Sequence, residues 1–238
     1  MNKYTVATAM KEVGGLGKPS KMPGFSYSVP AQECKTGSKL VKIKGSVCYN
    51  CYALKGNYTR FPAVGRALYN RLDLVENNPK WVGAMVFLIN WYASKTTHFR
   101  WHDSGDIQSV RHLTKIVEVC KFTPSVKHWL PTKEYGMVND FLIRNDITWR
   151  ELPDNMVIRM SGYMFNGKPP EFRGKFWRMD GIPTSTATYI DENEKPEVIH
   201  GSLCGAKWND GKCGSCRDCW SREVNNVTYP NQRQKINK

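Results

Sequence analysis

The chain has 238 residues, a formal net charge of +14 at pH 7 and 40% hydrophobic residues. This composition is ordinary for a folded protein with one sizeable core and a small appended lobe. The longest nearly apolar run, residues 81–93, is interrupted by Asn90 and is shorter than the roughly 20 residues of a membrane-spanning helix. No apolar segment follows Met1, so we expect a cytoplasmic protein with no membrane partner.

The positive charge is concentrated near the N-terminus. Residues 11–60 hold nine Lys and Arg side chains against Glu12 and Glu33. A positive field attracts polyanions, so we expect an anionic partner, either a small molecule or a nucleic acid. A basic surface that only keeps the protein soluble is the alternative.

The first part of the chain predicts one strand, a cysteine-containing loop and two helices. Residues 1–24 are basic and rich in Gly and Pro, and no regular structure is predicted there. Alternating residues predict a strand over 25–29. Apolar residues at spacings of three and four predict a helix over 62–77 and a second, largely buried helix over 79–92.

Residues 98–102 form the most informative predicted strand. Phe99 and Trp101 alternate with His98, Arg100 and His102, which gives one apolar and one polar face. Such a strand suits a barrel whose interior holds a charged ligand. It equally suits an antiparallel strand with its polar face in water.

The unit of strand and helix then repeats. The loop DSGD at 103–106 leads into a predicted helix over 107–121, and further strands are predicted over 127–132, 156–161 and 184–189. Alternating strands and helices imply a mainly parallel sheet with right-handed crossovers. We therefore predict an α/β fold built as a partial (βα) barrel with mainly parallel strands, and a flat doubly wound sheet is the alternative.

Three regions follow from this pattern. They are an irregular basic segment (1–24), the partial barrel with an N-terminal three-cysteine loop (25–191), and a C-terminal cysteine-rich metal lobe with a polar tail (192–238). The last boundary is placed where the composition becomes charged and rich in Gly.

Seven of the eight cysteines fall into two sets. The sets are Cys34, Cys48 and Cys51, with spacing C-x13-C-x2-C, and Cys204, Cys213, Cys216 and Cys219, with spacing C-x8-C-x2-C-x2-C. In a cytoplasmic chain such clusters predict metal ligands rather than disulfides. The second set is closer to iron–sulfur than to zinc spacing. The eighth, Cys120, lies on an apolar helix face and is predicted to be a small buried hydrophobic residue.

Three thiolates leave one metal position open, whereas four close the centre. The first set therefore predicts a [4Fe–4S] cluster whose fourth iron binds S-adenosylmethionine, and the second set predicts zinc or a second cluster. Two alternatives stay open. One is a zinc site that His200 or His102 completes, and the other is a set in which Cys34 joins the C-terminal cysteines.

Five segments of the chain are distinctive: KMPGFSYSVPA, SVCYNCYALKGNY, FRWHDSGDIQ, HWLPTKE and CGSCRDCW. They resemble segments of a family of bacteriophage and mobile-element proteins called gene product 88. This resemblance covers most of the chain and implies a phage protein, located in the host cytoplasm where a phage encodes it. It implies no particular activity.

A second resemblance, in the order of parts, is to radical S-adenosylmethionine enzymes: a strand, a three-cysteine loop, then a strand ending in a small acidic turn. It implies reductive cleavage of S-adenosylmethionine, a reducing electron donor and an auxiliary cluster at the last four cysteines. The matching positions are Ser104, Gly105 and Asp106 for the cofactor's amino group, and Thr132, Arg159 and Ser161 for its carboxylate and ribose. The usual loop of that superfamily, C-x3-C-x-aromatic-C, differs from the one in this chain.

A metal-braced nucleic-acid-binding protein or nuclease is the alternative function. Tyr52, Tyr58 and Phe61 would contact bases beside the basic residues. His102, Asp103, Asp106 and Glu134 would hold Mg²⁺.

The candidate catalytic residues are His102, Asp103 and Glu134. Asp103 and Asp106 equally suit turn and cap positions, because DSGD leads directly into a helix. Arg100 and Arg159 are candidates to bind a carboxylate of the ligand.

Overall fold

All strands of the protein lie in one sheet of the computed structural model, which describes residues 4–232. The strands are β1 (Phe25–Tyr27), β2 (His98–Trp101), β3 (Lys127–Thr132), β4 (Met156–Phe165), β5 (Thr184–Ile190), β6 (Ser202–Leu203) and β7 (Asn226–Gln232). Their order is β1-β2-β3-β4-β5-β7-β6, and every neighbouring pair is parallel. The predicted α/β class with a mainly parallel sheet is confirmed, and the sheet is open, with β1 and β6 at its edges.

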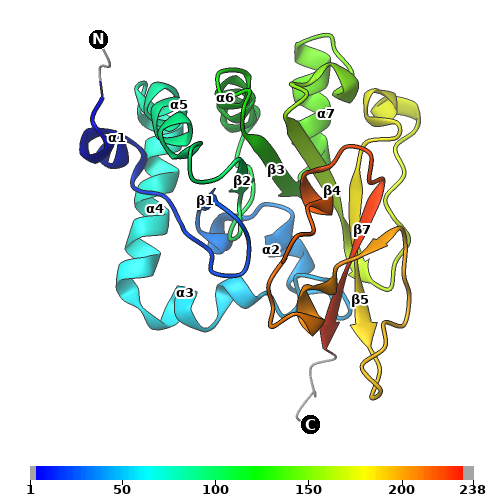
Figure 1. The fold of residues 1–238 in the computed structure, drawn as a ribbon. Coiled ribbons are helices and arrows are strands. Elements are labelled where there is room, and N and C mark those ends of the chain that lie inside the picture. The colour runs from blue at the N-terminus through cyan, green and yellow to red at the C-terminus, as the bar shows by residue number, and fades with distance from the viewer. Residues whose placement is uncertain (1–3, 233–238) are drawn as a thin grey trace.

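The first helix precedes β1, and the others lie in the connections between β1 and β4. The helices are α1 (Val6–Val13), α2 (Gly37–Leu40), α3 (Asn57–Arg60), α4 (Pro62–Asn77), α5 (Trp81–Tyr92), α6 (Val110–Lys121) and α7 (Tyr135–Arg144). Short 3₁₀ turns lie at Ala31–Glu33, Tyr52–Leu54, Trp149–Glu151, Gly174–Met179, Gly205–Trp208 and Asp218–Trp220. Figure 1 shows α5, α6 and α7 following one another along one side of the sheet. Within residues 4–232, no helix has the length and apolar character needed to cross a membrane.

The two faces of the sheet have different partners. Phe99 and Trp101 of β2 are buried in the core beneath the helices. Arg100, between them, points to the other face, where its guanidinium lies over the Trp129 ring. The predicted alternation of β2 is confirmed, and the antiparallel alternative is wrong because β2 pairs in parallel with β1 and β3. The second face packs on the segment around Cys219 and Trp220 rather than on long helices.

The N-terminal segment contains a helix that the sequence prediction missed. Thr5 caps α1 in a capping box with Thr8, and Gly14 ends it in a left-handed conformation. Ala9 and Val13 are fully buried on the face of α1 that packs against the core. The prediction of an irregular segment over 1–24 is therefore wrong for Val6–Val13, and residues 1–3 lie outside the described residues.

The C-terminal segment contributes strands to the main sheet. β7 pairs with β5 from Thr184↔Asn226 to Ile190↔Gln232. Hydrogen bonds between neighbouring polar side chains support this pairing, including Asn226 Nδ2 to Thr186 Oγ1 at 3.0 Å. The prediction of a separate lobe and polar tail over 192–238 is thus wrong for residues 226–232, and residues 233–238 are outside the described range.

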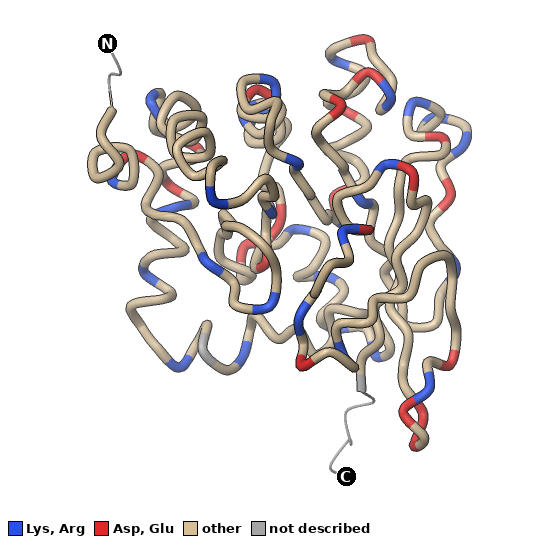
Figure 2. Tube along the Cα trace, in the orientation of Figure 1, with Lys and Arg blue, Asp and Glu red and all other residues tan. Residues whose placement is uncertain are grey.

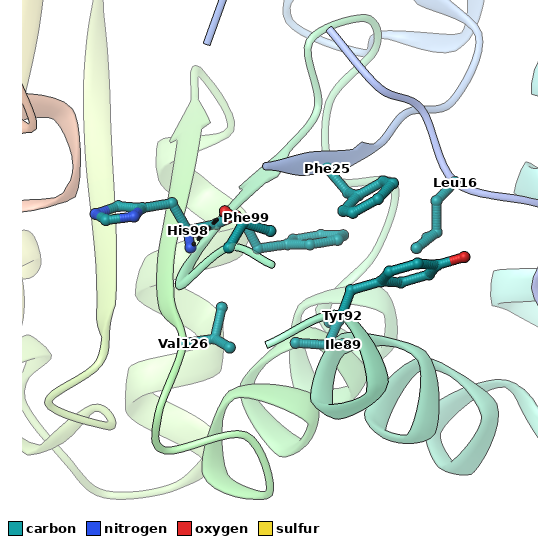
Figure 3. A pocket seen from close by; sticks show the side chains of 8 residues that line it. Leu16, Phe25, Ile89, Tyr92, His98, Phe99 and Val126 are labelled. Carbon is teal, nitrogen blue, oxygen red and sulfur yellow. Dashed lines mark hydrogen bonds between the residues drawn. The ribbon is translucent and has the colours of Figure 1, made fainter. Parts of the chain in front are cut away.

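The amino ends of β1 and β2 are closely packed. Figure 3 shows the apolar side chains that meet there, among them Phe25, Ile89, Tyr92 and Val126. The cavity between them measures about 10 Å³, which is at the lower limit for one water molecule. A ligand site therefore has to lie elsewhere on the sheet.

His128, a buried residue on the helix-facing side of β3, gives a prediction on stability. Its Nε2 lies 2.8 Å from Thr123 Oγ1, and burial lowers the pKa of His128 from 6.5 to about 3. Because the folded pKa lies below the unfolded value, the stability that neutral His128 contributes is complete above pH 6.5 and lost as pH falls towards 3. We expect urea unfolding to show a fall in the free energy of unfolding across this window. His128→Gln should make the fall less steep, and identical slopes would contradict this role.

Candidate functional site

A cavity of about 560 Å³ lies at the carboxyl ends of the central strands. Its walls are the three N-terminal cysteines, the loop 102–106 after β2, the ends of β3, β4 and β5, and residues 229–231 of β7. This is where parallel α/β folds place their ligands, because loops of different lengths meet at that edge. Its volume is in the range of small-molecule sites.

The cavity wall brings Cys34 together with Cys48 and Cys51, which follow it by 14 and 17 residues. A Cβ atom built at Gly37 would lie 3.8 Å from Cys34 Sγ and 3.9 Å from Cys48 Sγ. Burial raises the pKa of the Cys34 thiol, and the nearby Cys51, Cys48 and Asp106 raise it further. Burial also raises the pKa of Cys48, although the Lys133 charge opposes this. Cys34 therefore groups with Cys48 and Cys51 and does not join the C-terminal set.

Glu134 fixes the loop that carries Cys34. Its Oε1 accepts a hydrogen bond from Thr36 N at 2.7 Å, and its Oε2 accepts one from Thr36 Oγ1 at 2.8 Å. Glu134 is buried and does not line the cavity. The structure thus gives it a positioning role in place of the predicted catalytic one.

The four C-terminal cysteines surround a second cavity of about 270 Å³. Cys219 Sγ lies 3.1 Å from the Tyr229 hydroxyl, and Tyr229 also lines the larger cavity. Burial raises the pKa of Cys204, Cys213 and Cys219, the last to about 12. Within residues 4–232, no group of three or more His, Cys, Asp and Glu side chains is arranged to hold a single metal ion.

Arg159 holds the segment between Cys219 and β7. It is fully buried, and its guanidinium donates to the carbonyl oxygens of Thr184, Asp218, Cys219, Ser221 and Val224 at 2.6–3.2 Å. Arg159 does not line the cavity. The prediction that it binds a cofactor carboxylate is wrong here, since its donors are used by backbone carbonyls.

The acidic residues of the DSGD turn are fully engaged in hydrogen bonds. Asp103 accepts hydrogen bonds from Ser26, Ser28 and Tyr58. Asp106 accepts from Thr132 Oγ1 at 2.6 Å, Ile107 N at 2.8 Å and Lys133 N at 2.9 Å. Burial raises the pKa of Asp106 to about 6. Both carboxylates line the cavity and brace the ends of β1, β2 and β3.

His102 follows β2 in an unusual backbone conformation. Its φ is 57°, in the left-handed region that non-glycine residues seldom adopt. Its ring lies edge-on to His112, 5.2 Å between centroids, and both ring nitrogens are buried without a hydrogen-bond partner. Burial holds the pKa of His102 well below 6.5, so the ring is neutral at pH 7. It lines the cavity but cannot supply a proton as a charged imidazolium.

The remaining predicted cofactor residues lie at the cavity. Ser104, Gly105, Thr132 and Ser161 all line it. Ser104 Oγ donates to Val29 O at 3.2 Å, and Ser161 Oγ accepts from Ser185 Oγ at 3.1 Å. At Gly105 the backbone of this turn also packs closely against Val29.

Gly105 allows this approach, which gives a prediction. Its φ is +79°, and an added Cβ would lie 2.5 Å from both Val29 O and Val29 Cγ2. Gly105→Ala should lower the free energy of unfolding by about 2 kcal/mol or more. Gly136→Ala in α7, where an added Cβ meets nothing within 4 Å, should be neutral or slightly stabilising. Urea denaturation measures both, and equal effects would contradict the proposed close contact.

Sequence reasoning missed several residues of the cavity. Trp129 and Lys133 come from β3 and its exit, Ser185 and Thr186 from β5, and Tyr229 from β7. Alternation along 127–132 could have identified Trp129 as facing the same side as Arg100. Tyr229 gave no such signal, because its strand was assigned to a polar tail.

These features define an α/β protein with an open parallel sheet and a cysteine-lined cavity at the carboxyl ends of its strands. The chain matches the family described as gene product 88 over residues 2–222, and it belongs to that family. No curated protein and no solved structure shows a significant match.

Proposed function

We propose that the protein is an iron–sulfur enzyme of the radical S-adenosylmethionine type that acts on a nucleotide, nucleic acid or other anionic substrate. The observation that supports this most is the position of Cys34, Cys48 and Cys51 on one wall of the 560 Å³ cavity. The proposed partial barrel agrees with a sheet that has α5–α7 on one side, while Arg100 and Trp129, which point to the other side, line this cavity.

The side chains present suit an open [4Fe–4S] cluster. The donor set is three free thiols, and the cavity beside them has room for a small molecule. Cys34, Cys48 and Cys51 would hold such a cluster, which would supply the electron for reductive cleavage of S-adenosylmethionine. Cluster binding requires thiolates, and the Lys133 charge favours the thiolate of Cys48.

The protein's own groups position and shield this site. Glu134 fixes the Cys34 loop through Thr36, and Asp106 fixes Thr132 and the Lys133 backbone. Ser104, Gly105 and Ser161 offer polar groups on the cavity wall, where we propose that the cofactor's amino, carboxylate and ribose groups bind.

We propose that Cys204, Cys213, Cys216 and Cys219 hold a closed centre, either a second cluster or zinc. Zinc would require the thiols to move closer together, because no three such side chains within residues 4–232 are arranged around one metal ion. All four line the 270 Å³ cavity. Four thiolates complete a centre without an external ligand, so this centre would brace the C-terminal segment or carry electrons.

Nucleic-acid binding is the second candidate, supported by the net charge of +14. Figure 2 shows Lys and Arg on helices and loops alike, so the charge is not confined to one element. Tyr52 and Phe61 are exposed and suit base stacking. The nuclease version has less support, because Asp103, Asp106 and Glu134 already accept hydrogen bonds from the protein.

Metal analysis tests the proposal. The protein is purified without oxygen, and iron, acid-labile sulfide and zinc are measured, followed by reductive cleavage of S-adenosylmethionine with dithionite. Iron and sulfide together with cleavage are the expected result. Zinc alone at both sites would overturn the radical enzyme, and strongly salt-dependent DNA or RNA binding would then favour the second candidate.

A further inference from the structure

Arg100 is a cavity-lining cation that lacks an acidic partner. None of the ion pairs among the described residues includes it. Its Cζ lies 4.4 Å from the centroid of the Trp129 ring, its direct neighbour on β3. Arg100 Nε and Trp129 Nε1 are buried without hydrogen-bond partners. Such a group is costly to hold in a cavity unless a ligand supplies the missing charge.

The nearby acids do not supply that charge. Asp103 is engaged by Ser26, Ser28 and Tyr58, and Asp106 by Thr132 and two backbone N–H groups. Among the described residues, neither Asp103 nor Asp106 forms an ion pair with Arg100. The cavity therefore presents a cation to its contents.

Arg100 lies apart from the other cavity cation. Lys133 follows Trp129 by four residues, which corresponds to about 13 Å along an extended strand. The Lys133 charge acts on the pKa of Cys48, whereas the Arg100 charge acts on the pKa of Tyr52, Cys213 and Tyr229. Arg100 also hydrogen-bonds to Tyr52, the neighbour of Cys51, so its charge lies between the cysteine trio and the C-terminal segment, whereas the Lys133 charge acts on Cys48.

We infer that Arg100, stacked on Trp129, binds an oxyanion of the substrate, a carboxylate or a phosphate. Naming this oxyanion part of a substrate rests on the proposed function, but its binding does not require a cluster. Trp129 also stacks with Tyr229, with 6.4 Å between ring centroids. The aromatic wall suits a ligand that joins the oxyanion to a flat apolar body.

Binding of simple aromatic oxyanions tests the inference. Phenyl phosphate and benzoate are titrated into the purified full-length protein by calorimetry, with benzyl alcohol as the neutral comparison. We expect at least one oxyanion to bind and the alcohol not to bind. Arg100→Gln should weaken the oxyanion about 10- to 100-fold, since a charge-assisted hydrogen bond is lost. The preferred oxyanion distinguishes phosphate from carboxylate.

Two further variants control the experiment. Arg66→Gln removes an equal charge from an exposed position of α4 and should leave the affinity unchanged. Arg100→Lys keeps the charge without the planar group, so it should bind more weakly than the wild type and serves as the test if Arg100→Gln does not fold. Absence of oxyanion binding, equal binding of the alcohol, or wild-type affinity in the Arg100 variants would overturn the inference. The binding test needs no reductant and no cluster. Finding zinc in place of iron would therefore overturn the proposed radical enzyme but would leave the result of the oxyanion-binding test independent.

Discussion

Cys48→Ala is expected to abolish reductive cleavage of S-adenosylmethionine while the fold is retained. Cys48 lines the large cavity, and its sulfur and that of Cys34 both approach Gly37. Removing one of three thiol ligands leaves an open cluster with two, which is too few to hold it. Iron and sulfide should fall at this site, and cleavage should drop to the level without protein. These effects are measured by metal analysis, by the absorbance of the thiolate-to-iron charge-transfer bands and by analysis of the cleavage products.

Two other cysteines provide controls for this experiment. Cys120→Ala removes a fully buried thiol from α6, outside both cavities, and should keep the metal and the activity. Cys216→Ala should chiefly harm folding or electron supply, because Cys216 lines the second cavity. Equal cleavage by the wild type and the Cys48 variant would contradict the assignment of the open site.

The sequence predicted the central part of the sheet well for a physical reason. In β2 the buried Phe99 and Trp101 alternate with the less buried His98 and Arg100, so burial imposes a period of two on the sequence. In β4, residues 156–160 are all buried, and the apolar character of this run predicted the strand. α1 and β7 were not predicted, because the residues within each element carry only a weak signal for a helix or a strand. α1 has eight residues in a Gly-rich and Pro-rich setting, and β7 is stabilised by Asn and Thr hydrogen bonds with distant β5.

The site was predictable where residue chemistry restricts the choice. Grouping Cys34 with Cys48 and Cys51 followed from counting thiols, and the structure places them on one cavity wall. The roles of individual polar residues were harder to predict from the sequence. Arg159 and Arg100 both occupy inward positions on strands, yet one is enclosed by five carbonyls and the other stacks on Trp129. That difference depends on the path of residues 218–224, which no local pattern in the sequence encodes.

Arg159→Met is expected to produce the largest loss of stability. The side chain is fully buried and donates to the carbonyl oxygens of residues that flank Cys219. Met fills a similar volume but leaves these buried acceptors unsatisfied, which should lower the free energy of unfolding by about 3 to 5 kcal/mol. The segment carrying Cys219 should lose its fixed path, so metal at the C-terminal set should be lost before metal at Cys34, Cys48 and Cys51.

A matched substitution separates this effect from a general loss of charge. Arg173→Met removes an arginine whose side chain is 84% exposed, and the free energy of unfolding should change by less than about 0.5 kcal/mol. Urea unfolding and metal analysis of both variants test whether the Arg159 hydrogen bonds stabilise the C-terminal segment. Wild-type stability and full metal content in Arg159→Met would mean that the five hydrogen bonds do not hold the second centre together. The C-terminal segment would then depend on its thiols and on β7 alone.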